Sequence, residues 1–160
     1  MSAATPVVTL RPMTEADYAA YLPRATEAYA AEVARNNLVS EDEGLARSQR
    51  SFETELPDGI HTPDQRLFIA EDAEGELIGY LWLARKPETD TVFIYDIEVV
   101  AERRGEGFGR RLMELVEVEG RAMGMSRIEL NVHADNEVAR SLYESAGYRE
   151  MRRQMVKLLD

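Results

Sequence analysis

The stretch that decides the fold is Thr91-Val-Phe-Ile-Tyr-Asp-Ile-Glu-Val-Val100, followed at once by Ala-Glu-Arg-Arg-Gly-Glu-Gly-Phe-Gly109. Its first ten residues are mostly apolar, which is typical of a strand in a buried sheet. The glycines at positions 105, 107 and 109 predict a turn, and a helical period of apolar residues begins at Phe108. The stretch therefore predicts a strand, a glycine-rich turn and the start of a helix in direct succession.

A turn of this kind is suited to bind a phosphate group. Glycines let the backbone approach an anion closely, and the first amides of a helix point outward without a partner in the helix. Four arginines crowd the turn in an otherwise acidic protein: Arg103, Arg104, Arg110 and Arg111. A purely structural turn needs neither three glycines nor four arginines, so we expect a site for a phosphorylated cofactor.

A dinucleotide-binding fingerprint is the competing interpretation of the turn. Gly105 and Gly107 would be its first two glycines, but position 110, where the third is required, is Arg110. Such a fingerprint also usually follows the first strand of its domain, whereas this turn follows the fourth predicted strand. Both departures disfavour a dinucleotide site.

The rest of the chain predicts a mixed α/β arrangement. The predicted strands cover residues 7–11, 66–71, 77–85, 91–100, 127–132 and 148–158, the last as one or two strands. The predicted helices cover residues 14–35, 40–56, 108–124 and 136–146. Adjacent strands imply antiparallel pairing, and the later strand–helix–strand unit implies a parallel crossover. We expect one domain over residues 1–160, of class α/β (α+β), with a mixed central sheet of six to seven strands and helices on both faces.

Composition narrows the classes of partner. The net charge of −11 disfavours nucleic acid and anionic membranes, which attract clustered positive charge, and mildly favours a cationic amine. The absence of cysteine excludes disulfides, a thiolate nucleophile and cysteine metal sites, and no spacing of His, Asp or Glu suggests a metal. The first six residues lack the features of a signal peptide, and no apolar run approaches a membrane span. We therefore expect a cytoplasmic protein.

Two motifs together give the chain a resemblance to a known family. Arg104-x-x-Gly107-x-Gly109, after a strand ending Ile97-Glu98-Val99, is similar to the pyrophosphate-binding motif of the GNAT superfamily of N-acetyltransferases. Downstream, Asn136-x-x-Ala139-x-x-Leu142-Tyr143-Glu144-x-x-Gly147-Tyr148 resembles the second signature of that family. The likeness covers roughly residues 5–158 and extends to bacterial members of unassigned substrate.

The resemblance implies the GNAT fold and acetyl-CoA (coenzyme A) as cofactor. The amides of the turn would hold its pyrophosphate: Arg104, Gly105, Glu106, Gly107, Phe108 and Gly109. The backbone from Ile97 to Val99 would pair with the pantetheine arm. Asn136 would hydrogen-bond the same arm, although asparagine is also a preferred helix N-cap. In this family a bulge splays the strand before the turn from its neighbour and opens a slot for that arm; the sequence itself shows no bulge.

The candidate catalytic residues are Tyr143, Asp96 and Glu98. By the resemblance, Tyr143 is the general acid that protonates the departing thiolate; a packed core tyrosine is the alternative. Asp96 and Glu98 interrupt an apolar strand at alternate positions, so both carboxylates point to one face. Either would take the proton of the attacking ammonium, unless both pair with Arg or Lys. Asp96 is slightly preferred because it sits deeper in the run, and a water chain is a further alternative.

The expected function is that of an acetyl-CoA-dependent N-acetyltransferase that moves an acetyl group directly to a primary amine of a small molecule. Two alternatives stay open: a catalytically silent acyl-CoA-binding regulatory module, and a protein lysine or N-terminal acetyltransferase. We expect the amine pocket to come from the first two predicted helices and the loop over residues 57–64. A homodimer is compatible with the sequence, but no feature requires one.

Overall fold

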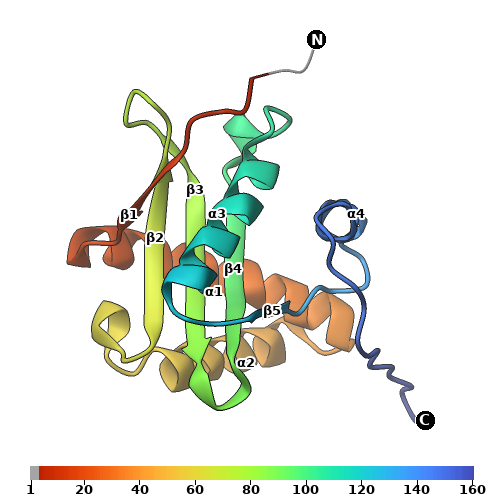
Figure 1. Ribbon diagram of the computed structural model, residues 1–160. Helices are drawn as coiled ribbons and strands as arrows, with labels where there is room; N and C mark the ends of the chain where they lie inside the picture. The colour runs from red at the N-terminus through yellow and green to blue at the C-terminus, as the bar shows by residue number, and fades with distance from the viewer. Residues whose placement is uncertain (1–3) are drawn as a thin grey trace.

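A mixed five-stranded sheet forms the centre of the molecule (Figure 1). The computed structural model describes residues 4–160; residues 1–3, where the segment tested above for a signal peptide begins, lie outside the description. The strands are β1 (Thr9–Pro12), β2 (Gln65–Glu71), β3 (Leu77–Lys86), β4 (Thr91–Val99) and β5 (Arg127–Leu130). The α-helices are α1 (Glu15–Asn37), α2 (Glu41–Glu55), α3 (Phe108–Ala122) and α4 (Glu137–Ser145).

The sheet is antiparallel from β1 to β4, and β5 runs parallel to β4 at the edge. Helices α1 and α2 cover one face and α3 covers the other, which confirms the predicted mixed sheet with helices on both faces (Figure 1). None of the helices within residues 4–160 combines the length and the apolar character needed to cross a membrane.

The prediction of six to seven strands is wrong. Residues 148–158, expected to form the last one or two strands, pair with no strand in the described part of the chain. A strand exists only through hydrogen bonds to a neighbouring backbone. The apolar pattern of this segment predicts an extended chain but does not say where its partner lies.

The first helix begins where its sequence signal places it. The hydroxyl of Thr14 accepts a hydrogen bond from the amide of Asp17 at 3.2 Å, and the carboxylate of Asp17 accepts one from the amide of Thr14 at 2.8 Å. This reciprocal capping box satisfies two amides that the helix cannot. It fixes the start of α1, whose inner face packs on the sheet through Tyr21 and Ala25.

A bulge in β4 redirects its side chains. Trp82 of β3 pairs with Asp96 and Leu83 pairs with Ile94, so Tyr95 is an extra residue in β4. A bulge of one residue reverses which face the following side chains occupy. Parallel pairing with β5 also ends here, at Ile94 opposite Leu130. Beyond the bulge, the edge of β4 that faces β5 is therefore left without a partner among residues 4–160.

Gly79 lets β3 pass close to the far end of β4. A Cβ built on Gly79 would lie 1.8 Å from the backbone oxygen of Glu98, so a side chain here must displace β4. We expect Gly79→Ala to lower the free energy of unfolding in urea by about 2–3 kcal/mol. The control is Gly120→Ala in α3, where the added Cβ would meet Val92 at an ordinary 3.5 Å and the helix would gain propensity. Equal loss in the two variants would contradict the close approach.

Candidate functional site

The glycine-rich turn joins the short helix η3 (Ala101–Arg103) to α3. Gly105 and Gly107 have φ of +80° and +86°, a backbone conformation that favours glycine, and Gly107 is the N-cap of α3. A Cβ on Gly105 would meet nothing within 4 Å, and one on Gly107 would meet only Pro6 at 3.9 Å. Open space therefore borders the N-terminus of α3, where the helix dipole and the first amides attract an anion.

The side chains of the turn are largely committed to holding its shape. Arg103 donates to the carboxylate of Glu106 at 3.0 Å, and Arg104 donates to the backbone oxygen of Val99 at 3.1 Å. The ring of Phe108 is buried in the core. The backbone amides are consequently the groups that this turn offers to a phosphate.

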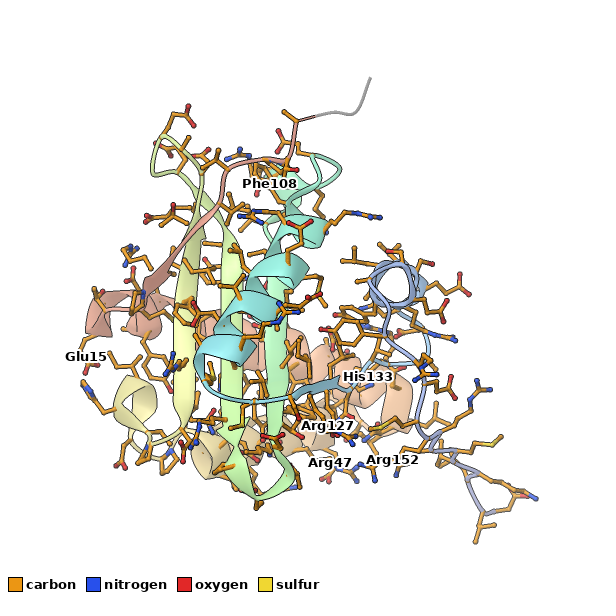
Figure 2. The ribbon with its side chains drawn as sticks, viewed as in Figure 1. Glu15, Arg47, Phe108, Arg127, His133 and Arg152 are labelled. Atoms are coloured by element: carbon orange, nitrogen blue, oxygen red, sulfur yellow. The ribbon has the colours of Figure 1, made fainter. Side chains whose placement is uncertain are left out.

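A cleft of about 2890 Å³ runs from the turn along β4 to α1 and α2. Figure 2 shows Phe108 towards one end of the molecule and Arg47 and Arg127 towards the other, and all three border this cleft. Its wall includes Ile97, Glu98 and Val99 of β4, on the strand segment beyond the bulge. The separation of β4 from β5 thus opens directly into the cleft.

Four of the predicted site residues meet at a smaller cavity of about 110 Å³, located where β4 leaves β5: Asp96, Ile97, Asn136 and Tyr143. The remaining lining is Glu32 of α1, Ile94 and Tyr95 of β4, and the stretch from Leu130 to His133. Glu98 borders the larger cleft but not this cavity. The site therefore combines residues from α1, β4 and α4 that are far apart in the chain.

Asp96 is held by a hydrogen bond that the sequence did not suggest. Its Oδ2 accepts from the hydroxyl of Tyr21 in α1 at 2.7 Å, and Tyr21 is only 1% exposed. Burial raises the pKa of Asp96 to about 6, against the opposing effect of the Tyr21 hydrogen bond and with a contribution from the charge of Glu98. Near neutral pH the carboxylate is mostly ionised, yet it takes up a proton readily.

Glu98 points to the same face but has a different partner. Nη1 of Arg24 donates to both of its oxygens, at 2.9 and 3.1 Å, and the guanidinium of Arg24 lies 4.3 Å from the centre of the Tyr80 ring. This is the Arg pairing considered above as the alternative to a base. Arg24 already binds both oxygens of Glu98, and only Asp96 lines the small cavity, so the geometry favours Asp96 over Glu98 as the basic group.

Tyr143 lines the cavity, and its hydroxyl takes part in none of the hydrogen bonds found among residues 4–160. Burial raises its pKa to about 12, with further contributions from the charges of Asp96 and Glu32. The hydroxyl therefore stays protonated at neutral pH.

Asn136 is the N-cap of α4, and its side-chain oxygen accepts a hydrogen bond from the amide of Ala139 at 3.2 Å. Its side-chain NH₂ group remains available to donate.

Only part of the region predicted to form the amine pocket borders the cleft. Tyr29 and Glu32 of α1 and Arg47 of α2 do so. The loop over residues 57–64 does not border it, and His61 in that loop binds Glu15 at 2.6 Å instead. No group of three or more His, Cys, Asp or Glu that could hold a metal occurs within residues 4–160.

Comparison with known proteins agrees with this architecture. A model of the acetyltransferase (GNAT) family matches residues 27–148. The uncharacterized N-acetyltransferase YycN of Bacillus subtilis (strain 168) is 30% identical over 145 residues, which are 89% of this chain and 93% of YycN. The spermidine N(1)-acetyltransferase of Vibrio cholerae serotype O1 is 30% identical over 92 residues, which are 57% of this chain and 53% of that enzyme.

The crystal structure of YycN from Bacillus subtilis superposes with a TM-score of 0.91 at 30% identity, covering 96% of this chain and 99% of that chain. The family match spans well over half of the chain, and it includes both the glycine-rich turn and α4. The chain therefore belongs to the acetyltransferase (GNAT) family, whose members are acetyl-CoA-dependent acyltransferases.

Proposed function

We propose that this protein transfers the acetyl group of acetyl-CoA directly to a primary amine of a small molecule. The observation that supports this most strongly is the meeting of Asp96 and Tyr143 at one cavity. Asp96 can accept a proton near neutral pH, and the hydroxyl of Tyr143 stays protonated. Amine acetylation requires such a pair, because a proton leaves the nucleophile and another reaches the leaving sulfur.

The residues toward acetyl-CoA fit a ligand with a pyrophosphate and an extended arm. The amides from Gly105 to Gly109 would hold the pyrophosphate at the N-terminus of α3, whereas the amide of Arg104, also expected to take part, already donates to Ala101 at 3.4 Å. The free edge of β4 beyond the bulge would bind the pantetheine arm through Ile97 and Val99, and Asn136 would donate to the same arm. The amide of Val100 donates to Ile78 of β3, so the amide of Val99 points to the opposite edge of β4, toward β5.

Each step of the proposed reaction is assigned to one of three groups: Asp96, Tyr143 and the amide of Val99. Acetyl-CoA would supply the acetyl group as a thioester. The ammonium of the acceptor would lose one proton to the carboxylate of Asp96, and its nitrogen would then bond to the acetyl carbon. As the carbon–sulfur bond breaks, the hydroxyl of Tyr143 would give its proton to the sulfur, and the second proton lost by the nitrogen would return to the Tyr143 oxygen. The products are a neutral amide and a free thiol, with one proton left on Asp96. The amide of Val99 would stabilise the negative charge that develops on the carbonyl oxygen.

The small cavity favours a cationic acceptor. Two carboxylates, Glu32 and Asp96, line it, and its lining among residues 4–160 includes no Lys or Arg. Their negative potential attracts an alkylammonium and repels an acidic substrate. The similarity to a spermidine N(1)-acetyltransferase supports the same class of acceptor, a small molecule with one or more primary amines.

The cofactor part of the proposal is tested by calorimetric titration of acetyl-CoA. A glutamate at Gly107 would place a negative charge where the pyrophosphate is expected, so Gly107→Glu should weaken binding by about 100-fold or more. The control is Gly75→Glu in the turn between β2 and β3. Gly75 has a matching φ of +82° and equally open surroundings, but it does not border the cleft. Equal affinity of the two variants would refute the proposed phosphate site.

A further inference from the structure

A row of aromatic rings leads away from the small cavity along the sheet. Tyr95, the extra residue at the bulge, lines the small cavity and also borders the large cleft. The centre of its ring lies 4.5 Å from that of Trp82, on which it stacks, and 4.8 Å from that of Phe93. Phe52 of α2 lies 5.5 Å from Trp82. All four rings border the cleft, so its part between α2 and β4 is lined by aromatic side chains.

Lys86, the last residue of β3, lies at the far end of this row. Figure 1 shows this end of the sheet next to α2. The Nζ atom of Lys86 donates to the hydroxyl of Tyr95 at 3.1 Å and lies 5.3 Å from the ring centres of both Phe93 and Tyr95. Asp96 directly follows Tyr95 in the chain. Tyr95 therefore connects the acidic cavity, next to its backbone, with a cation at its hydroxyl.

Lys86 forms no ion pair within residues 4–160, unlike Arg24 of α1, which binds Glu98 at 2.9 Å. The hydrogen bond to Tyr95, together with the charge of Glu55, raises the pKa of Lys86, so its ammonium stays charged at neutral pH. Glu55 of α2 borders the same part of the cleft without pairing with this ammonium. A partly buried ammonium with no paired carboxylate can bind an anionic group of a ligand.

The two ends of the aromatic row offer different charges to a ligand. The small cavity is lined by the carboxylates of Glu32 and Asp96, which attract an ammonium. The other end offers both a cation, Lys86, and a carboxylate, Glu55. A head group with a carboxylate and an ammonium on one carbon complements this second pair. The rings between the two ends suit an apolar carbon chain.

We propose, on the basis of the function proposed above, that the acceptor is a diamino acid with its side-chain amine at Asp96 and its α-carboxylate and α-ammonium at Lys86 and Glu55. Such a molecule has two ammonium groups and one carboxylate at neutral pH, so it is a cation that an acidic protein attracts. Its carbon chain would lie along Tyr95. The side-chain nitrogen receives the acetyl group, and the α-carbon groups serve only in recognition.

Acceptor binding can be measured without turnover, on the protein loaded with CoA, which has no acetyl group to transfer. Calorimetric titration compares L-lysine and L-ornithine with 1,5-diaminopentane and 1,4-diaminobutane, the diamines that remain when the carboxylate is removed. At least one diamino acid should bind about tenfold or more tightly than its diamine, because its carboxylate gains a charge-assisted hydrogen bond. If neither diamino acid binds more tightly than its diamine, the proposal is wrong.

Lys86→Met should remove this preference, since methionine keeps an apolar chain against Phe93 and Tyr95 but cannot bind a carboxylate. The affinity for the preferred diamino acid should fall about tenfold or more, and that for its diamine should stay within about twofold. The control is Lys157→Met, because Lys157 is the other lysine of the chain, is exposed and does not border the cleft. An equal loss for both ligands, or no loss, would overturn the role of Lys86 in recognition.

Glu55→Gln tests the other half of the head group. The ligands are L-lysine and 6-aminohexanoate, which is L-lysine without its α-amine. The variant should weaken the binding of L-lysine by about tenfold and leave that of 6-aminohexanoate within about twofold, because only L-lysine has an α-ammonium to bind. Weaker binding of both ligands, or of neither, would overturn the assignment of Glu55.

Steady-state kinetics separates the choice of acceptor from the proposed function. In Lys86→Met, KM for the diamino acid should rise about tenfold or more while kcat stays within about twofold, and mass spectrometry should locate the acetyl group on the side-chain nitrogen. Preferential binding of a diamino acid with no acetylated product would refute the transferase and support the acceptor site. Acetylation of the diamines with no preference for the diamino acids would support the transferase and overturn the acceptor site.

Discussion

Asp96→Asn is expected to lower kcat/KM for amine acetylation by about 10²–10³-fold at pH 8. Asparagine keeps the shape of the side chain and still accepts the hydrogen bond of Tyr21, but it cannot take a proton. In the wild type the rate should rise as the pH increases through about 6, because the ionised form of Asp96 is the active one. The pH profile of kcat/KM should lose this acid limb in the variant, while acetyl-CoA affinity stays within about twofold.

Two controls separate catalysis from folding. Glu98→Gln removes the neighbouring carboxylate, which Arg24 already binds, and its pH–rate profile should retain the acid limb.

The second control is the pH dependence of stability. Folding raises the pKa of Asp96 from 3.8 to about 6, so between these pH values the unfolded chain binds fewer protons than the folded one. The contribution of Asp96 to stability should therefore fall as the pH rises from about 4 to 6, while carboxylates with a lowered pKa, such as Asp17 and Asp72, contribute the opposite slope. The stability of the wild type relative to that of Asp96→Asn should fall over this range. An unchanged pH–rate profile in Asp96→Asn would rule out Asp96 as the base.

Tyr143→Phe should lower kcat by about 10²-fold and leave acetyl-CoA affinity nearly unchanged. The substitution keeps the ring, which packs with Leu142 against the core between α3 and the sheet. It removes only the hydroxyl, whose pKa of about 12 keeps it a proton donor throughout the working pH range. Steady-state kcat and calorimetric affinity for acetyl-CoA measure the two effects separately.

The matched control is Tyr148→Phe. The ring of Tyr148 lies 5.9 Å from that of Tyr143, and its hydroxyl is buried with no hydrogen-bond partner in the described chain. Removing an unsatisfied buried hydroxyl should be neutral or stabilising, with little effect on kcat. If Tyr143→Phe instead lowers kcat and acetyl-CoA affinity in parallel, Tyr143 serves in binding and the donor is another group.

The glycine-rich turn was predictable because its signals are local. An apolar strand, glycines with positive φ and the helical period from Phe108 each follow from a few neighbouring residues. The bulge at Tyr95 was not predictable, since it depends on the register between β4 and β3. Asp96 and Glu98 both follow the bulge, so the expectation that they share a face holds, and both reach partners on α1.

The partners of these carboxylates could not be found from the sequence. Tyr21 and Asp96 are 75 residues apart, and Arg24 and Glu98 are 74 apart. Only the packing of α1 on the sheet brings them together, and no local pattern encodes that contact.

The incorrect prediction of strands over residues 148–158 arose because a local signal was read without knowledge of a partner strand. Their apolar content is a local signal, but strand pairing requires a partner edge that the described chain does not supply to itself.

The most direct test of the proposed function is mass spectrometry of the products formed by the wild-type protein from acetyl-CoA and a panel of amines. The panel contains spermidine, short diamines and a peptide with a free N-terminus and a lysine, and released thiol is measured in parallel. We predict that a small amine gains one acetyl group for each thiol released, and that Asp96→Asn abolishes most of this product. Tight acetyl-CoA binding with no acetylated amine, or acetylation of the peptide in preference to every small amine, would contradict the proposed function.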